Sequence, residues 1–282
     1  MNGMEGKVAL VTGATGGIGR ITARELAKAG ADLTIVARSK DKAAETLAEI
    51  NAAAPNAKVD VIYADLSEIA QVRAAAAEFK KKHDRLHLLV NNAGAVNMER
   101  HVTKDGFELT FAVNHLAYFV LTNELLDLLK ASAPARIVSV ASDGHRIGKI
   151  DFDDLQGEKA FGGMKAYTQS KLANILWSNE LARRLQGTGV TSNSVHPGVV
   201  ATGFGRNSPG FFNFLVKLGS IFMITPEKGA RTTLHVATSP DVGNTTGAYW
   251  AKRKPSRPAK QALDEAVGKR LWEVSEQLVA GK

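Results

Sequence analysis

The 282-residue sequence contains no cysteine. This absence excludes disulfide bonds, thiolate metal sites and cysteine nucleophiles, and it is typical of a reducing compartment, so we expect a cytoplasmic protein. Long apolar runs are missing as well, because the most apolar stretch, Phe211–Ile224, is interrupted by Asn213, Lys217 and Ser220. A helix that spans a bilayer needs about 20 mostly apolar residues, so no membrane span is expected. The first strand-like run begins at Lys7, so we expect no secretory leader.

Motifs of several other function classes are also absent. The net charge of +8 attracts anions, but the basic residues are scattered and no aromatic-interleaved basic groove accompanies them, so we expect no nucleic-acid partner. None of the seven histidines has acidic partners at metal-ligand spacing, which predicts no metal site. The sequence has no G-x-S-x-G elbow of the kind that serine hydrolases use.

Strand-like and helix-like patterns alternate along the chain. Val8–Val11 is a continuous apolar run, typical of a strand buried on both faces of a parallel sheet, and a helical pattern over Ile18–Ala29 ends at Gly30. Repeated strand–helix units predict one α/β domain over residues 1–282, a doubly wound Rossmann fold with a mostly parallel sheet of about seven strands and helices on both faces. The other expected strands are Leu33–Ala37, Val59–Tyr63, Leu86–Val90, Arg136–Val140, Val190–Val195 and Gly247–Trp250. The other expected helices are Lys40–Ala53, Ile69–His83, Phe107–Leu129, Tyr167–Leu185, Glu227–Thr238 and Gln261–Leu278.

Two stretches interrupt the alternation. Residues 143–165 form a polar, glycine-bearing insertion, and residues 203–225 are rich in phenylalanine. Long excursions from a compact α/β domain are usually functional loops or lids.

A glycine-rich turn joins the first expected strand to the first expected helix. It reads Thr12-Gly-Ala-Thr-Gly-Gly-Ile-Gly19, with the spacing G-x-x-x-G-x-G. Glycines let a backbone approach a pyrophosphate closely, and a helix N-terminus offers free N–H groups. The strand–turn–helix context therefore predicts a dinucleotide site. Its residues here are Gly13, Thr15, Gly17, Ile18 and Gly19.

The end of the second expected strand indicates which dinucleotide binds. An acidic residue there would accept a hydrogen bond from a ribose 2′-hydroxyl, whereas an arginine pairs with a 2′-phosphate. The sequence has Ala37-Arg38 and no acid, and Lys40 and Lys42 follow. A guanidinium can grip a phosphate through two hydrogen bonds, so Arg38 favours NADP(H) over NAD(H).

Tyr167 and Lys171 are four residues apart on one expected helix and so share a face. A free tyrosine titrates near pKa 10, and a neighbouring cation favours its phenolate. Such a pair alone is a weak signal, since it is more often part of a solvent-exposed helix face. Its weight comes from the motifs that surround it.

Taken together, these motifs resemble the short-chain dehydrogenase/reductase family, and within it the retinol-dehydrogenase-like NADP-dependent reductases. The resemblance covers essentially the whole chain. The family's motifs occur in its order as the glycine turn, Asp65-Leu66, Asn91-Asn92-Ala93-Gly94, Asn114, Ser142, Tyr167/Lys171 and Pro197-Gly198. The closer likeness lies in Arg136–Ser142, His145–Lys149, Ser170–Asn174, Leu181–Val190 and His196–Val200.

The resemblance implies a catalytic group of four residues. Tyr167 would be the general acid for carbonyl reduction, and Lys171 would lower the pKa of Tyr167 and hold the nicotinamide ribose. Ser142 would bind the substrate oxygen, and Asn114 would hold a water that relays protons. Further cofactor contacts are implied for Asp65, Leu66, Asn91, Ala93, Gly94, Pro197, Val200 and Thr202.

The resemblance also implies a small-molecule carbonyl or alcohol as substrate. Residues 203–225 lie where the family places its substrate lid, and their aromatic residues suit a lipophilic aldehyde or ketone, although they could equally be core or subunit interface. A regulator that binds NADPH without turnover, a protein that binds nucleic acid through its basic surface, and a C=C reductase on the same fold stay open as alternatives. Many relatives form dimers through the helices expected at Phe107–Leu129 and Tyr167–Leu185, so both a monomer and a homodimer are compatible with the sequence.

Overall fold

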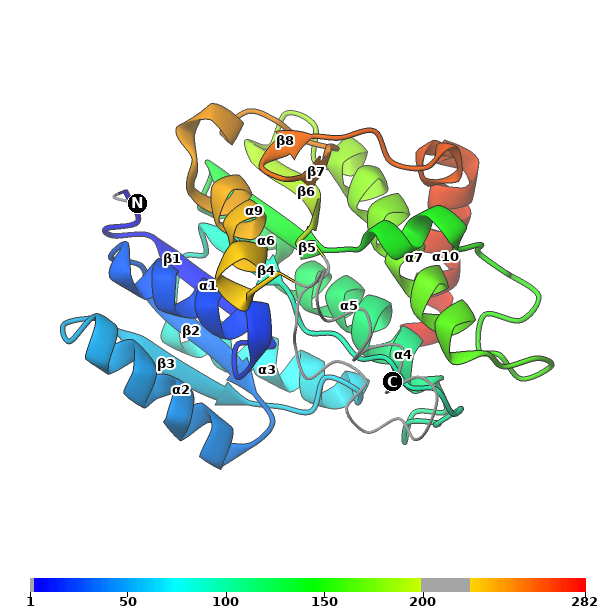
Figure 1. Cartoon of the computed structure of the whole chain (residues 1–282), viewed down its shortest axis with the longest axis horizontal. Coiled ribbons are helices and arrows are strands. Elements are labelled where there is room, and N and C mark those ends of the chain that lie inside the picture. Colours follow the sequence, from blue (N-terminus) through cyan, green and yellow to red (C-terminus); the bar gives the residue numbers. More distant parts are fainter. Residues whose placement is uncertain (1–2, 199–223) are drawn as a thin grey trace.

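The computed structural model describes residues 3–198 and 224–282 (Figure 1). In this part of the chain one eight-stranded sheet has the order β3-β2-β1-β4-β5-β6-β7-β8. The pairs from β3 to β7 are parallel, and β8 pairs with β7 in antiparallel orientation. The strands are β1 (Val8–Thr12), β2 (Asp32–Ala37), β3 (Val59–Tyr63), β4 (Leu88–Asn91), β5 (Ala135–Val140), β6 (Val190–His196), β7 (Tyr249–Ala251) and β8 (Lys254–Pro255).

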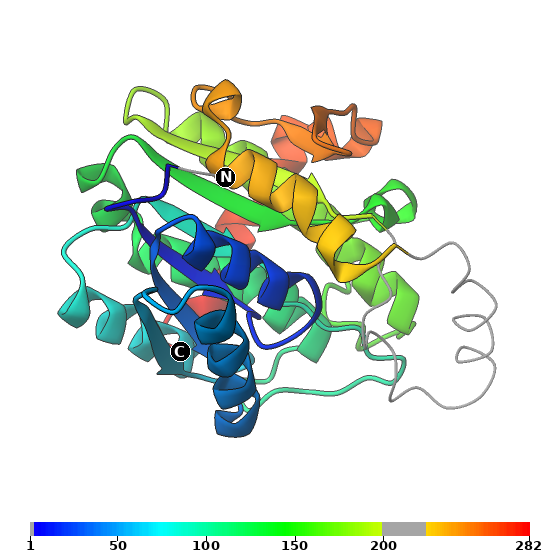
Figure 2. The same ribbon diagram turned by 60° about the vertical axis from the view of Figure 1, so that its left-hand side comes forward.

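Helices cover both faces of the sheet (Figures 1 and 2). α1, α2 and α9 lie on one face, whereas α3, α5 and α7 lie on the other with α10 packed behind them. The helices are α1 (Gly17–Lys28), α2 (Lys40–Ala53), α3 (Ile69–Lys82), α4 (Leu109–Phe111), α5 (Ala117–Glu124), α6 (Leu126–Ala131), α7 (Gly163–Arg184), α9 (Pro226–Thr238) and α10 (Glu265–Val279). This layering confirms the doubly wound α/β fold expected from the sequence.

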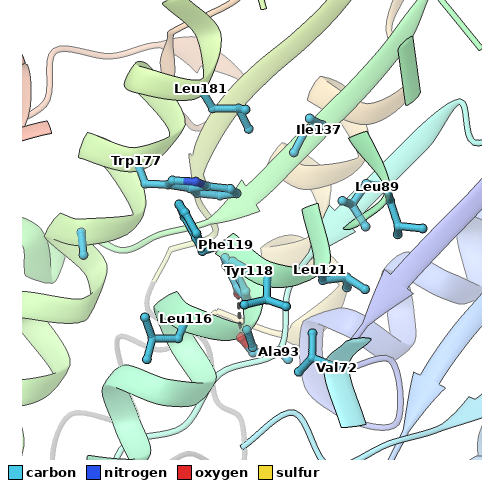
Figure 3. Packing of buried hydrophobic residues seen from close by; sticks show 14 of the residues in the cluster. Val72, Leu89, Ala93, Leu116, Tyr118, Phe119, Leu121, Ile137, Trp177 and Leu181 are labelled. Carbon is cyan, nitrogen blue, oxygen red and sulfur yellow. Dashed lines mark hydrogen bonds between the residues drawn. The ribbon is translucent and has the colours of Figure 1, made fainter. Parts of the chain in front are cut away.

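The sheet separates two hydrophobic cores because its strands are apolar on both faces. On one side Val11 and Ile35 of the sheet pack with Leu234 of α9. On the other side the core holds the large aromatic residues Phe119 and Trp177 (Figure 3). Burying one such ring removes 150–250 Å² from water, so these side chains dominate the energy of packing.

The expected strands are present within two residues at most of their predicted ends, and β8 brings the number to eight instead of about seven. β8 is only two residues long, and Pro255 lies within it. So short an edge strand leaves no periodic pattern in the sequence.

The single long helix expected over Phe107–Leu129 is wrong. The structure instead has the short α4, a π-helical turn at Ala112–Leu116, then α5, and after a break at Leu125 the helix α6. π turns of this kind are often found at functional sites, and this one carries Asn114.

The helix that carries Tyr167 begins at Gly163, four residues earlier than expected. A Cβ at Gly163 would lie 2.4 Å from the backbone oxygen of Asn97, so the helix start lies directly against the segment that follows β4. The insertion at 143–165 is therefore partly helical at both ends, with a 3-10 turn over Asp143–Ile147 at its beginning.

The last expected helix is divided into a 3-10 turn at Lys260–Leu263 and α10, whose N-terminus is capped by Asp264. α10 packs against α7 and α5. The Trp272 ring meets Phe119 with 5.0 Å between ring centres, and Ser275 lies 2.8 Å from His115. The faces of α5 and α7 are thus covered by the chain's own C-terminal helix.

None of the helices in the described ranges is long and apolar enough to cross a membrane.

Candidate active site

The expected site residues lie along the carboxyl ends of the parallel strands, and the central part of the site is formed by three neighbouring strands. Thr12 ends β1, Asn91 ends β4, and Val140 ends β5 two residues before Ser142. β1 and β4 are neighbours in the sheet without being consecutive in the chain. At such a switch point the connections run to opposite faces and leave a crevice in which α/β proteins bind ligands.

The glycine turn between β1 and α1 is fastened to the end of β4. The side-chain amide of Asn92 donates to the carbonyl oxygens of Thr12 at 3.0 Å and Gly13 at 3.2 Å. The Thr12 hydroxyl accepts the backbone N–H groups of Asn92 at 2.9 Å and Ala93 at 3.1 Å. A Cβ at Gly19 would lie 2.1 Å from the Gly13 oxygen, so only glycine fits there. Thr12 and Asn92 both belong to the sequence motifs, and the structure gives them a role that the motifs alone did not predict, which is to join the glycine turn to the end of β4.

The N-terminus of α1 is open toward the crevice. Its N-cap is Gly16, which is exposed, and a Cβ there would meet no protein atom within 4 Å. The first turn of α1 contains no acidic residue. Free amide groups without a nearby carboxylate suit a pyrophosphate, so the turn fits the dinucleotide expected from the sequence. Thr15 and Ile18 are partly buried on either side of Gly16, and Gly17 has a φ of +49°.

Arg38 and Asp65 face each other across the ends of β2 and β3. The Arg38 guanidinium is 79% exposed and lies 3.7 Å from Asp65 Oδ2. Asp65 Oδ1 accepts the backbone N–H of Ser67 at 3.0 Å and its hydroxyl at 2.8 Å. Burial raises the pKa of Asp65, but these bonds and the charge of Arg38 outweigh it and hold that pKa below its usual value. Most donors of Arg38 thus stay accessible to a phosphate, and Leu66 packs partly buried on the adjoining core.

Tyr167 and Ser142 meet where α7 passes the turn that follows β5. The Ser142 hydroxyl accepts the backbone N–H of Gly144 at 3.1 Å, which leaves its own proton to donate. A hydrogen bond with Ser142 lowers the pKa of Tyr167, but burial has the larger effect and raises it above the usual value. The expectation of a pKa lowered by Lys171 is therefore wrong, because burial outweighs the effects that favour the phenolate and holds the phenol in its protonated form at neutral pH.

Lys171 lies one helical turn beyond Tyr167 and is buried. Its ammonium donates to the Val140 carbonyl at 3.0 Å and lies 5.9 Å from the centre of the Tyr167 ring. Burial alone lowers the pKa of Lys171 to about 7. Near neutral pH this amine therefore exchanges between its charged and neutral forms, which suits a group that takes part in proton transfer.

Asn114 connects the π turn to the catalytic helix. Its side chain accepts the Ala95 N–H at 2.7 Å, and it donates to the Ala95 carbonyl at 3.0 Å and to the Ser170 hydroxyl at 2.9 Å. Ser170 in turn donates to the Tyr167 carbonyl at 2.7 Å. Asn114 therefore fixes α7 beside the segment after β4, and its expected role as a water holder stays a prediction.

The residues expected to line the cofactor cleft occupy different environments. Asn91 is fully buried and donates to Thr122 of α5 at 3.0 Å, so its amide faces the core. The Ala93 carbonyl accepts the Tyr118 hydroxyl at 2.6 Å (Figure 3). A Cβ at Gly94 would lie 3.6 Å from the Lys171 nitrogen, which places the Gly94 backbone beside the catalytic amine.

Pro197, at the end of β6, is partly buried, whereas Val200 and Thr202 lie outside the described residues, as does the expected lid except for its last two positions. Within the described ranges, no group of three or more His, Asp or Glu side chains could hold a metal ion.

Comparison with known proteins agrees with this geometry. A family model described as short chain dehydrogenase matches residues 7–209. The chain is 45% identical to retinol dehydrogenase 12 of Mus musculus over 97% of this chain and 86% of that protein. It is 44% identical to retinol dehydrogenase 11 of Homo sapiens over 96% of this chain and 85% of that protein.

Solved structures give the same result. An uncharacterised protein from Mycobacterium paratuberculosis has a TM-score of 0.81 and 30% identity, covering 99% of this chain and 95% of that one. A short chain dehydrogenase from Burkholderia cenocepacia in complex with NADP has a TM-score of 0.71 and 29% identity, covering 88% and 95%. The chain belongs to the short chain dehydrogenase family of oxidoreductases and resembles its retinol dehydrogenases.

Proposed function

We propose that this protein interconverts a lipophilic carbonyl compound and its alcohol with NADP(H), and that Tyr167 is the general acid and base. The convergence of Tyr167, Ser142 and Lys171 beside the glycine turn is the observation that carries this proposal. A protein that only sensed NADPH would have no need of an acid at this place.

In carbonyl reduction, bound NADPH supplies a hydride to the carbonyl carbon. Ser142 donates a hydrogen bond to the carbonyl oxygen and fixes the substrate beside Tyr167. Tyr167 transfers its phenolic proton to that oxygen, and the products are the alcohol and a tyrosine phenolate. Lys171 in its charged form stabilises the phenolate until solvent returns a proton, with Asn114 as the proposed holder of the relaying water.

The experiment that tests this function offers the purified protein NADPH and a panel of retinoid, steroid, aliphatic and aromatic carbonyls. We expect consumption of NADPH and formation of the alcohol from lipophilic members of the panel. NADPH binding without turnover of any carbonyl would favour the regulator. A product that keeps its carbonyl and has lost a C=C bond would favour the C=C reductase.

A lipophilic substrate is supported by apolar surface next to the catalytic turn. Ile147, at the end of the 3-10 turn that begins after Ser142, is 80% exposed, and Met164 at the start of α7 is 41% exposed. Both border a hollow of about 240 Å³ that Thr168 and the charged side chains of Lys149, Asp151 and Lys165 also line. Exposed apolar side chains that gather around a concave surface are typical of sites for apolar ligands.

We place the preference for NADP(H) on Arg38. Arg38→Ala is expected to raise the KM for NADPH about tenfold and to change the KM for NADH less than about twofold, because one charge-assisted bond to an exposed phosphate contributes about 1.5 kcal/mol. Steady-state kinetics with both cofactors measures this. Arg85→Ala is the control, because Arg85 is exposed and precedes β4, at the amino ends of the strands and away from the carboxyl ends where Arg38 lies. Equal effects of Arg38→Ala on both cofactors would contradict the assignment.

Because NADPH is a hydride donor, its use also indicates that carbonyl reduction is the main direction of the reaction. We expect this reaction to take place in the cytoplasm, since the sequence has no cysteine.

We further propose that the protein is a monomer. α10 packs along α7, its Trp272 meets Phe119 of α5, and its Ser275 lies beside His115 of the π turn. A second chain would have to displace this helix to reach these parts of α5 and α7. Light scattering at micromolar concentration should give the mass of one chain, and a mass of two chains that persists on dilution would contradict the proposal.

A further inference from the structure

One carboxylate links the segments that follow β5 and end β6 to Tyr249, the first residue of β7. Asp143 Oδ1 accepts the hydroxyl proton of Tyr249 on β7 at 2.9 Å and the guanidinium N–H of Arg146 at 3.1 Å. Asp143 Oδ2 lies 3.4 Å from Nε2 of His196, which ends β6. None of these residues entered the catalytic group inferred from the sequence.

Asp143 and His196 hold each other at two points. The backbone N–H of Asp143 donates to His196 Nδ1 at 3.2 Å, so Nδ1 carries a lone pair and no proton. The proton of the neutral ring is therefore on Nε2, where it faces the Asp143 carboxylate. This arrangement fixes both the orientation and the tautomer of the imidazole.

The two residues are adjacent in sequence to the reacting groups. Asp143 directly follows Ser142, and His196 directly precedes Pro197, which the family resemblance places at the nicotinamide. The contact thus extends the pairing of β5 and β6, whose last backbone bond runs from the Ala141 N–H to the Val195 oxygen at 2.9 Å, to the segments that carry Ser142 and Pro197. A displacement of about 1 Å between such groups can lower a rate about a hundredfold.

We propose that Asp143 and His196 are positioning residues for hydride transfer, which keep Ser142 in register with Pro197 only while the His196 ring is neutral. The proposal rests on the proposed function and goes beyond it by adding a pair outside the catalytic group. In this proposal neither Asp143 nor His196 contacts the reacting atoms. If Nδ1 were protonated, its N–H would face the backbone N–H of Asp143, and two donors cannot form a hydrogen bond. The contact between Asp143 and His196 Nδ1 would then be lost.

The charged neighbours of His196 come from two segments. Asp143, His145 and Arg146 lie on the turn after β5, Lys252 follows β7, and His196 itself ends β6, while the Tyr249 hydroxyl bonds Asp143 from β7. Burial is the main influence and lowers the pKa of His196, Asp143 opposes this, and the cationic neighbours lower it further. With its pKa below the usual 6.5, the ring is neutral at pH 7 and the contact is intact. The contact is lost as the pH falls through the lowered pKa.

Two substitutions at His196 separate positioning from stability. His196→Ala removes the acceptor of the Asp143 N–H, and we expect kcat at pH 7.5 to fall about thirtyfold with KM changed less than about threefold. His196→Asn places an amide oxygen close to the position of Nδ1, and the asparagine side chain is not protonated in this pH range. We expect its kcat to stay within about threefold of the wild type and its acid limb below pH 6.5 to be absent. His235→Asn on α9, whose ring contacts Trp250, is the control that should keep the limb.

Equal loss of kcat in both His196 variants, no loss in His196→Ala, or an acid limb that persists in His196→Asn would overturn the proposal. Thermal melting of each variant shows whether a loss follows from unfolding, and if His196→Ala does not fold, the acid limb of His196→Asn decides. If the wild type reduces no carbonyl, the proposed function fails by itself. The Kd for NADPH then tests the positioning role of Asp143 and His196. A higher Kd in His196→Ala but not in His196→Asn supports the proposal, and an equal Kd in the two variants overturns it.

Discussion

Tyr167→Phe is expected to lower kcat at least about a thousandfold while the Kd for NADPH stays within about threefold, because general acid catalysis by a positioned side chain contributes about 10²–10⁴-fold. The substitution removes the only proton that Tyr167 can give and leaves the ring that packs under Gly144. We expect affinity for the cofactor to depend mainly on the glycine turn and Arg38, which are unchanged. Stopped-flow turnover and fluorescence titration with NADPH measure the two quantities separately.

The raised pKa of Tyr167 determines how the rates of reduction and oxidation depend on pH. Burial raises the pKa of Tyr167, so the phenol is protonated throughout the neutral range and ready to donate. Reduction uses this form directly. Oxidation of the alcohol needs the phenolate, so its rate should rise as the pH increases, and this rise should also disappear in Tyr167→Phe.

Tyr63→Phe is a matched control, because Tyr63 ends β3, is 48% exposed and lies outside the catalytic group. Its kcat should equal that of the wild type within about twofold. If Tyr167→Phe kept more than a tenth of the wild-type kcat, the proton would have another source, and Tyr167 would not be the acid.

The strands could be predicted from the sequence because their signal is local, and the mostly parallel sheet followed from the alternation of strands and helices. A strand buried on both faces must be apolar at successive positions, as Val8–Val11 and Leu33–Ala37 are. The motifs of the expected catalytic group could also be recognised in the sequence by their order. The structure brings Ser142, Tyr167 and Lys171 together at the crevice.

The features that could not be predicted depend on contacts between distant segments. The π turn around Asn114 is held by Ala95 and Ser170, which lie 19 and 56 residues away. Propensity alone favours a continuous helix there, so tertiary contacts override it. The low pKa of Lys171 is likewise a result of burial, which the four-residue spacing from Tyr167 cannot reveal.

The Asp143–His196 contact spans 53 residues and joins two neighbouring strand ends. In the sequence Asp143 stands in a polar insertion and His196 before a Pro-Gly pair, and neither pattern identifies a partner. Only the pairing of β5 with β6 places the two side by side.

Gly19→Ala is expected to weaken NADPH binding at least about thirtyfold and to lower the free energy of unfolding by about 1–3 kcal/mol, the usual cost of overpacking. The added Cβ would lie 2.1 Å from the Gly13 oxygen and 2.3 Å from the Asn92 amide nitrogen. Alanine favours a helix over glycine by about 1 kcal/mol, but a backbone clash of this size outweighs that preference. The turn must therefore shift away from β4 and lose the two bonds that Asn92 donates to it.

Gly16→Ala separates the two effects, because its Cβ would meet no protein atom within 4 Å and its backbone, at φ −169° and ψ 162°, is open to any residue. Its unfolding free energy should stay within about 1 kcal/mol of the wild type, while NADPH binding weakens because the methyl group stands at the open end of α1. Chemical denaturation and titration with NADPH measure both variants. If Gly19→Ala bound NADPH like the wild type, the glycine turn would not hold the pyrophosphate, and the cofactor would have to bind elsewhere in the crevice.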